Sequence, residues 1–348
     1  MTTRHGGLRQ VRLTRRSALA GGLGLSVLAA CAVAQSNNDH QVGGEWLNVN
    51  GVPQWLAVKG TPSVGPVLLI LHGGPGGSET LLFRHFNRDL EQRFRVAYWD
   101  QRGAGRSYDP DNPPPNMTVA QFVRDLEVII DHLRSRLRVP IVLLGHSWGS
   151  ALGLLYARDH PKSVAGFIGV GQVADQAAQE AASYAFALSE AQRRGNSKAV
   201  SELRAIGKPP YEVPALMVKN RWVETFGGYF APGFGKVGLV VSALLKGETG
   251  IGEIRQLIAA NEFSLRAMWP EVRTLDLPTL VPEVQVPIAF LLGSKDRQCP
   301  AELAAAYFER LRAPEKSLTW FERSAHNVPF EQPIEFNRKV VDLVDRWS

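Results

Sequence analysis

Cysteine is scarce in this chain, which excludes a fold held together by disulfides. Only Cys31 and Cys299 occur among the 348 residues. We expect Cys31 to be acylated or removed with a leader, and Cys299 then has no partner. Long apolar runs are lacking as well: VGLVVSALL at 237–245 is shorter than the roughly 18 residues that a spanning helix needs. The mature protein is therefore expected to be water-soluble or tethered by its end.

Acidic residues are absent from the first 30 positions, where five arginines lie. Taking those five charges from the formal net charge of +6 leaves +1 for the rest of the chain. The basic character thus belongs to the N-terminus, and the sequence does not indicate a nucleic-acid partner. With 45% hydrophobic residues, the remainder can bury a large core.

The first 34 residues have the layout of a bacterial export signal. The pair Arg15-Arg16 precedes the weakly hydrophobic stretch ALAGGLGLSVLAA, which resembles signals of the twin-arginine route. The sequence LAAC, ending at Cys31, resembles a lipobox, whereas AVA at 32–34 would suit cleavage before Gln35. We expect an exported protein, located in the periplasm or tethered to the membrane as a lipoprotein through Cys31. An N-terminal anchor helix that is never cleaved is the alternative.

Beyond a polar linker at 35–44, apolar runs alternate with helical patterns, as in a parallel α/β sheet with crossover helices. Asn50-Gly51 predicts a hairpin turn. Thr118 is the predicted N-cap of a long helix, and Pro161 is expected to end the next one. Continuous apolar runs are typical of strands buried on both faces. These runs lie within PVLLILHGG, FRVAYWDQ, VPIVLLGHS and VAGFIGVG.

The alternation stops between about 173 and 284, where almost no strand-like run occurs. Helices are expected at 174–206 and near 250–268, with the loops GKPPYE and FGGYFAPGFG between them. This region is therefore predicted to be a helical cap inserted between the sixth and seventh strands.

The α/β pattern then returns with VPIAFLLGSKD, a helix at about 300–312, KSLTWFERSAH and a final helix from about 331. We predict a core formed by 35–172 together with 285–348, with the cap as a second unit.

The stretch Gly145-His146-Ser147-Trp148-Gly149 is a G-x-S-x-G motif between a predicted strand and a predicted helix. In that setting a strained turn exposes the serine hydroxyl at the carboxyl edge of the sheet. Glycines on both sides avoid the clashes that a Cβ would cause, and the helix N-terminus adds partial positive charge. A serine that merely caps the helix is the structural alternative.

A serine nucleophile needs an imidazole base and a carboxylate that orients the imidazole. With this motif the expected chain order is serine, acid, histidine. Asp296 follows a late strand in FLLGSKD, and His326 follows the last strand in WFERSAH. Ser147, Asp296 and His326 are therefore the predicted catalytic triad.

An oxyanion hole needs two backbone N–H groups that point at one position. Trp148 directly follows the predicted nucleophile and would supply one of them. The glycine-rich stretch HGGPGG at 72–77 is the natural source of the other, for which we favour Gly74.

Four further residues near these motifs are interpreted as structural. His72 and His146 are expected to make hydrogen bonds that hold the loops, and Arg102 is expected to brace its turn. Cys299 is interpreted as a small buried filler rather than a reactive thiol.

Five motifs together resemble the α/β-hydrolase superfamily, and specifically its proline iminopeptidase branch: HGGPGG, WDQRGAGRS, GHSWGSALG, GSKD and SAHNVPFEQP. The resemblance spans roughly 45–348. It implies an α/β-hydrolase fold with a mostly parallel sheet and a helical cap, and a serine hydrolase that works through an acyl-enzyme. It implies no metal and no organic cofactor. Ser147 also argues against dehalogenase and epoxide hydrolase relatives, which use an aspartate at this position.

The resemblance further implies release of N-terminal proline, or a similar residue, from peptides. In this branch a cap carboxylate in an EF pair binds the free amine, and Glu262-Phe263 occupies the comparable place here. Glu224 is a second candidate.

After Glu262, however, the sequence departs from the usual continuation of the branch. A carboxylesterase or lactonase acting on small esters is therefore the alternative enzyme. A non-catalytic surface binding protein is the remaining alternative. The expected partner is a small peptide or ester, and the sequence does not indicate an oligomeric state.

Overall fold

The structure, a computed structural model, describes residues 43–60, 65–235 and 250–347. The predicted export signal, the twin arginines and Cys31 lie outside the described residues, as does the apolar run at 237–245. Those expectations therefore stay predictions. In the described part, no helix combines the length and the apolar character that a membrane crossing requires.

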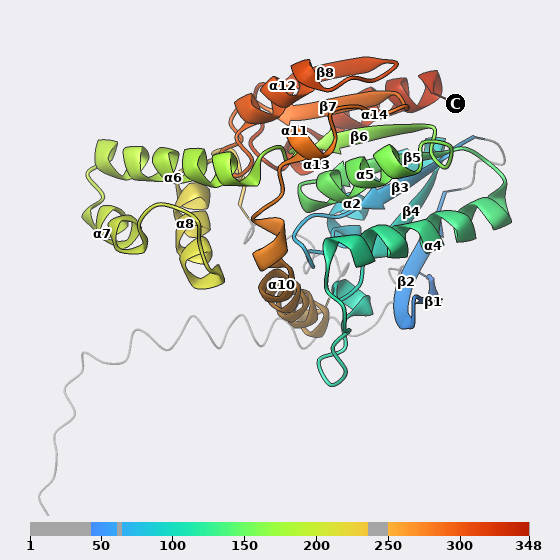
Figure 1. Cartoon of the computed structure of the whole chain (residues 1–348), viewed down its shortest axis with the longest axis horizontal. Helices are drawn as coiled ribbons and strands as arrows, with labels where there is room; N and C mark the ends of the chain where they lie inside the picture. Colours follow the sequence, from blue (N-terminus) through green and yellow to red (C-terminus); the bar gives the residue numbers. More distant parts are fainter. Residues whose placement is uncertain (1–42, 61–64, 236–249, 348) are drawn as a thin grey trace, which may run out of the picture. The chain divides into compact units, whose positions relative to one another are not determined.

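A sheet with the strand order β1-β2-β4-β3-β5-β6-β7-β8 forms the centre of the fold (Figure 1). The strands β3 to β8 pair in parallel, whereas β1 pairs antiparallel with β2 and β2 pairs antiparallel with β4. The predicted mostly parallel sheet is confirmed. The strands are β1 (Glu45–Val49), β2 (Val52–Lys59), β3 (Val67–Leu71), β4 (Arg95–Asp100), β5 (Ile141–His146), β6 (Gly166–Val170), β7 (Ile288–Gly293) and β8 (Lys316–Phe321).

Helices cover both faces of this sheet because its central strands are apolar on both sides. The helices around the sheet are α2 (Thr80–Phe86), α3 (Leu90–Arg93), α4 (Val119–Leu137), α5 (Trp148–Asp159), α12 (Ala301–Arg310), α13 (Val328–Glu331) and α14 (Pro333–Arg346), with the short 3-10 helix η2 (Gly105–Ser107). In β3, Leu69 packs in one cluster with α4 and α5, whereas Leu68 and Ile70 pack in the other with α2 and α14.

Two local predictions are confirmed in detail. Asn50 and Gly51 join β1 to β2 with φ values of 49° and 82°, the left-handed pair that a tight hairpin turn requires. The Thr118 side chain accepts a hydrogen bond from the Gln121 N–H at 3.2 Å and so caps α4.

The described segment between β6 and β7 is helical, as expected for the inserted cap. Its helices are α6 (Gln176–Arg193), α7 (Ser197–Ile206), α8 (Val213–Thr225), α10 (Ile251–Val272) and α11 (Leu277–Leu280). The stretch predicted at 174–206 is two helices, because Gly195 turns the chain at φ 62°. Figure 1 shows α6, α7 and α8 grouped together beside the sheet.

Sequence reasoning missed α8 altogether. Its first turn contains a proline, and Lys219 interrupts the apolar pattern although that side chain is fully buried. The burial depends on an acidic partner from α6, Glu180, which lies 39 residues earlier in the chain.

Candidate active site

Ser147 lies at a strained turn between β5 and α5. Its backbone has φ 52° and ψ −120°, a region that residues other than glycine seldom adopt. The Ser147 N–H donates to the Val170 carbonyl at 2.9 Å, which ties the turn to the end of β6. The side chain makes no capping hydrogen bond to α5, so the structure does not support the helix-capping alternative.

The two flanking glycines are required by close backbone contacts. A Cβ on Gly145 would lie 2.3 Å from the Gly149 carbonyl oxygen, and a Cβ on Gly149 would lie 1.9 Å from the Leu71 carbonyl oxygen. Both distances are far inside van der Waals contact, so a larger residue at either position would displace the backbone.

Asp296 and His326 meet at the ends of β7 and β8. His326 Nδ1 lies 2.7 Å from Asp296 Oδ2, and both side chains are only 1% exposed. The other carboxylate oxygen, Oδ1, accepts from the backbone N–H groups of Gln298 and Cys299, each at 2.9 Å. The carboxylate is thereby fixed, and it holds the imidazole with Nε2 directed away from the aspartate.

Two contacts bring His326 to the Ser147 turn. The His326 ring packs against Gly171, where an added Cβ would lie 2.8 Å from His326 Cε1. Gly171 directly follows Val170, whose carbonyl accepts from the Ser147 N–H. In addition, His146 Nε2 lies 3.0 Å from the His326 carbonyl oxygen. The structure therefore gathers the three predicted triad residues at one edge of the sheet.

A buried glutamate joins the loops on the other side of Ser147. Glu79 Oε1 lies 2.6 Å from His146 Nδ1, and Glu79 Oε2 accepts from the Gly73 N–H at 3.2 Å. Burial lowers the pKa of His146, but the charge and hydrogen bond of Glu79 outweigh it, so this pKa is raised overall. His146 thus has the hydrogen-bonding role that we expected, and a charged His146 would donate to both partners.

Gly74 and Trp148 line one pocket together with Ser147. As the first residue of α5, Trp148 has a backbone N–H without an intrahelical partner. Its indole Nε1 donates to Gln101 Oε1 at 3.0 Å, which fixes the side chain. Gly74 has φ 115°, a conformation that favours glycine. The two residues lie at the same pocket as Ser147, and their oxyanion role stays a prediction.

The other residues that we interpreted as structural are hydrogen-bonded or buried. His72 Nδ1 lies 2.9 Å from the Gly73 carbonyl oxygen, and His72 Nε2 accepts from the Gln101 N–H at 3.1 Å. Arg102 does more than brace its own turn, because it forms a fully buried ion pair at 2.7 Å with Asp125 of α4.

Cys299 is buried, as expected, but it also lines the pocket of Ser147. Burial raises the pKa of the Cys299 thiol, and a hydrogen bond with Ser147 lowers it only in part. The thiol is therefore poorly ionised, which agrees with the interpretation as an unreactive filler.

The pocket is closed on its far side by the inserted helices. Gln176 and Glu180 come from α6, Leu216 and Asn220 from α8, and Leu265 and Trp269 from α10. Its cavity volume of about 60 Å³ holds a few water molecules or one small side chain. The inserted region thus determines what can reach Ser147.

Two oxygen atoms in this lining, Glu180 Oε2 and Asn220 Oδ1, have no hydrogen-bond partner among the residues that the structure describes. The Glu180 carboxylate forms a buried ion pair with Lys219, whose Nζ lies 3.1 Å from Oε1 and 3.0 Å from Oε2. Only the Oε1 contact has hydrogen-bond alignment, so Oε2 keeps an unused acceptor position. Sequence reasoning missed both Glu180 and Asn220. The available signal for Glu180 was its spacing of four residues from Gln176, which puts both polar side chains on one face of an alanine-rich helix.

The two predicted amine-binding residues do not line this pocket in the described part of the chain. Glu262 is 53% exposed on α10 and pairs with Arg266 one turn later at 2.8 Å. Glu262 therefore does not face the pocket in this structure, because the inward face of α10 carries Ala260, Ser264 and Met268. Its amine-binding role stays a prediction. Glu224 is half-buried near Tyr229, whose pKa is raised by burial and further by this carboxylate.

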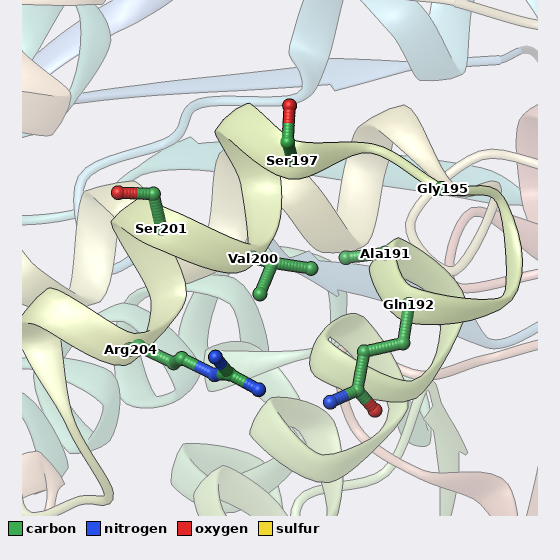
Figure 2. A pocket seen from close by; sticks show the side chains of 7 residues that line it. All are labelled: Ala191, Gln192, Gly195, Ser197, Val200, Ser201 and Arg204. Atoms are coloured by element: carbon green, nitrogen blue, oxygen red, sulfur yellow. The ribbon is translucent and has the colours of Figure 1, made fainter.

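A second, larger cavity of about 540 Å³ lies where α6 turns into α7 (Figure 2). Val200 and Ala191 face each other across it, and Arg204 and Gln192 form one side. None of the predicted site residues in the described ranges lines this cavity. Within the described ranges, no group of three or more histidine, cysteine, aspartate or glutamate side chains is arranged to hold a metal ion.

The family model for the alpha/beta hydrolase fold matches residues 66–203. A Bacillus subtilis (strain 168) protein named "Probable aminopeptidase YbaC" is 30% identical over 293 residues, which cover 83% of this chain and 92% of that protein. The proline iminopeptidase of Lactobacillus helveticus (strain DPC 4571) is 35% identical over 121 residues, 34% of this chain and 40% of that protein.

Solved structures share the fold at low identity. The proline iminopeptidase of Mycobacterium smegmatis superposes with a TM-score of 0.63 at 17% identity, covering 88% of this chain and 98% of that chain. An esterase from Rhodococcus superposes with a TM-score of 0.60 at 19% identity, covering 87% and 98%. At such identities the likeness establishes the fold, which is common to peptidases and esterases.

Proposed function

Because the chain belongs to the α/β-hydrolase family, in the branch of proteins like the proline iminopeptidases, we propose that it is a serine aminopeptidase. Its products would be N-terminal proline, or a similar small residue, and the shortened peptide. The observation that carries this proposal is the buried 2.7 Å contact of Asp296 with His326 beside the strained turn of Ser147.

In the proposed mechanism the Ser147 hydroxyl attacks the carbonyl carbon of the substrate while His326 Nε2 accepts its proton. Asp296 holds the imidazole through Nδ1 and stabilises the imidazolium. The N–H groups of Trp148 and Gly74 bind the oxyanion. The proton then passes to the leaving amine, and water, activated by the same histidine, hydrolyses the acyl-enzyme.

The acceptors in the pocket support an amine-bearing substrate. Glu180 Oε2 and Asn220 Oδ1 are buried and accept no hydrogen bond, although Oε2 lies 3.0 Å from Lys219 Nζ in the ion pair. The protonated secondary amine of an N-terminal proline carries two N–H donors. A cavity of about 60 Å³ suits a small first residue. We therefore assign the amine-binding role to Glu180 with Asn220, in place of Glu262.

Ester hydrolysis is the second candidate, because Leu216, Leu265 and Trp269 give the same pocket an apolar side. A short acyl ester offers no N–H donor, so binding it would leave Glu180 Oε2 and Asn220 Oδ1 without a hydrogen bond. This cost favours the aminopeptidase.

The test has two parts. A fluorophosphonate probe should label the wild-type protein and fail to label Ser147→Ala, whereas a non-catalytic binding protein would not be labelled at all. A panel of prolyl and other aminoacyl arylamides beside short acyl esters should then show the higher kcat/KM on prolyl arylamide. A clear preference for the esters would establish the second candidate.

A further inference from the structure

The buried carboxylate of Glu331 links two loops that are far apart in sequence. It lies at the end of α13, five residues after His326, and is 6% exposed. One oxygen accepts from the Ala325 N–H at 2.7 Å, next to His326. The other accepts at 2.5 Å from the N–H of Ala231, which is 100 residues away in the inserted region.

Residues 227–231, which we call the strap, contact the His326 loop at further points. The Tyr229 carbonyl accepts from the His326 N–H at 3.2 Å and from Asn327 Nδ2 at 2.7 Å. The Tyr229 ring lies 5.4 Å from the His326 ring, centre to centre. The strap therefore holds both the backbone and the ring of the proposed base.

The same strap also contacts the turn that carries Asp296. The Arg297 N–H donates to the Gly228 carbonyl at 2.8 Å. The approach is close, since a Cβ on Gly228 would lie 2.6 Å from the Arg297 Cβ. The strap thus contacts both the Asp296 loop and the His326 loop. Among the described hydrogen bonds, Glu331 is the only carboxylate that links the strap to the His326 loop.

We propose that Glu331 is a positioning residue that fastens the His326 loop to the strap, so that the inserted region controls the alignment of the catalytic base. The proposal rests on the role of His326 in the proposed function. Glu331 acts through two backbone N–H groups and does not touch the reacting atoms.

The fastening depends on the charge of Glu331. Burial raises the pKa of this carboxyl to about 7, and the hydrogen bonds from Ala231 and Ala325 lower it only in part. Of the charged groups around it, Asp296 raises this pKa further and His146, which is paired with Glu79, lowers it. Protonation places an O–H group opposite one of the two N–H donors, so both bonds are strong only when Glu331 is ionised.

Activation of Ser147 should then depend on the ionisation of Glu331 in addition to the unprotonated base that every serine nucleophile needs. The rate constant for labelling by a neutral fluorophosphonate measures this activation without any assumption about the substrate. We expect the acid limb of its pH profile in the wild type to be steeper than a slope of 1 on logarithmic axes over about the first tenfold fall of the rate constant.

Glu331→Gln keeps the size of the side chain but places an NH₂ group opposite one N–H donor. We expect labelling at pH 8 to slow about tenfold and the acid limb to fall to a slope of about 1. Glu322→Gln is the matched control, because this exposed glutamate lies in the same loop and carries the same charge. Its profile should equal that of the wild type.

Asn327→Ala provides a second variant, which removes one bond to the strap without removing a titrating group. It should slow labelling and keep the steep first part of the acid limb. A wild-type acid limb with a slope of 1 throughout, or Glu331→Gln labelled as fast as the wild type, would overturn the inference and leave the proposed function intact. A wild type that is not labelled would instead refute the proposed function.

Discussion

Replacing Glu180 by glutamine tests whether the pocket binds an amine. The carboxylate lies in the lining, and its Oε2 accepts no hydrogen bond although it is ion-paired with Lys219, so a substrate ammonium would gain a charge-assisted hydrogen bond there. Such a bond is worth roughly 1.5–3 kcal/mol, and its loss should lower kcat/KM about 10- to 150-fold on prolyl arylamide. A short acyl ester carries no amine and should be hydrolysed almost as before.

The single variant also affects stability, because Lys219 is fully buried and its ion pair with Glu180 would be lost. Leaving one buried charge unpaired costs about 3–5 kcal/mol, a large part of the roughly 5–15 kcal/mol that keeps a typical domain folded. The double variant Glu180→Gln with Lys219→Met removes the stranded charge as well. Replacing a whole buried pair in this way is often neutral or stabilising, so the double variant isolates the effect on the substrate.

The assay compares kcat/KM of the double variant on prolyl arylamide and on the ester, with thermal unfolding as the control for folding. We expect a loss of at least about tenfold on the arylamide alone. An equal loss on both substrates would mean that Glu180 only supports the shape of the pocket. Unchanged activity on the arylamide in a folded double variant would refute the amine-binding role.

Three further predictions concern the nucleophile, its turn and the leader. Ser147→Ala should lower kcat by orders of magnitude with an unchanged melting temperature, and His326→Ala should lower kcat nearly as much because triad members act as a unit. Retained turnover in Ser147→Ala would falsify the mechanism. Gly149→Ala should lower the free energy of unfolding by about 1–3 kcal/mol in denaturant titrations, since its Cβ would lie 1.9 Å from the Leu71 carbonyl oxygen. Unchanged stability would show that the turn tolerates a side chain. Mass spectrometry of the native protein should find an acylated Cys31 as the first residue, whereas an unmodified start at Gln35 would contradict the lipoprotein and retain export.

Local sequence patterns were sufficient to predict the sheet and the three residues at its edge. Buried parallel strands must be apolar throughout, so FLLG and IVLLGH are recognisable without their neighbours. The turn at Ser147 demands glycines at fixed offsets, because the clashes that exclude a Cβ come from the neighbouring backbone. The parallel arrangement then brings the residues that follow β5, β7 and β8 to one edge.

Recognition of the substrate could not be determined in this way. Whether a glutamate of the inserted helices faces the pocket depends on the rotation and packing of α6, α8 and α10 against one another. Glu262 matched a family pattern, yet it lies on the solvent side of α10 and pairs with Arg266. Glu180 matched no pattern, yet a lysine 39 residues away allows its charge to be buried beside Ser147.

The sequence by itself therefore determined the strands, the strained turn and the order of serine, acid and histidine, because each follows from short-range steric and periodic constraints. Only the tertiary structure decided which carboxylates face the pocket and which one fastens the His326 loop to the strap. The physical reason is that a charged group is buried only where partners from distant segments compensate its desolvation. Those partners are Lys219 for Glu180 and two backbone N–H groups, 94 positions apart in the chain, for Glu331.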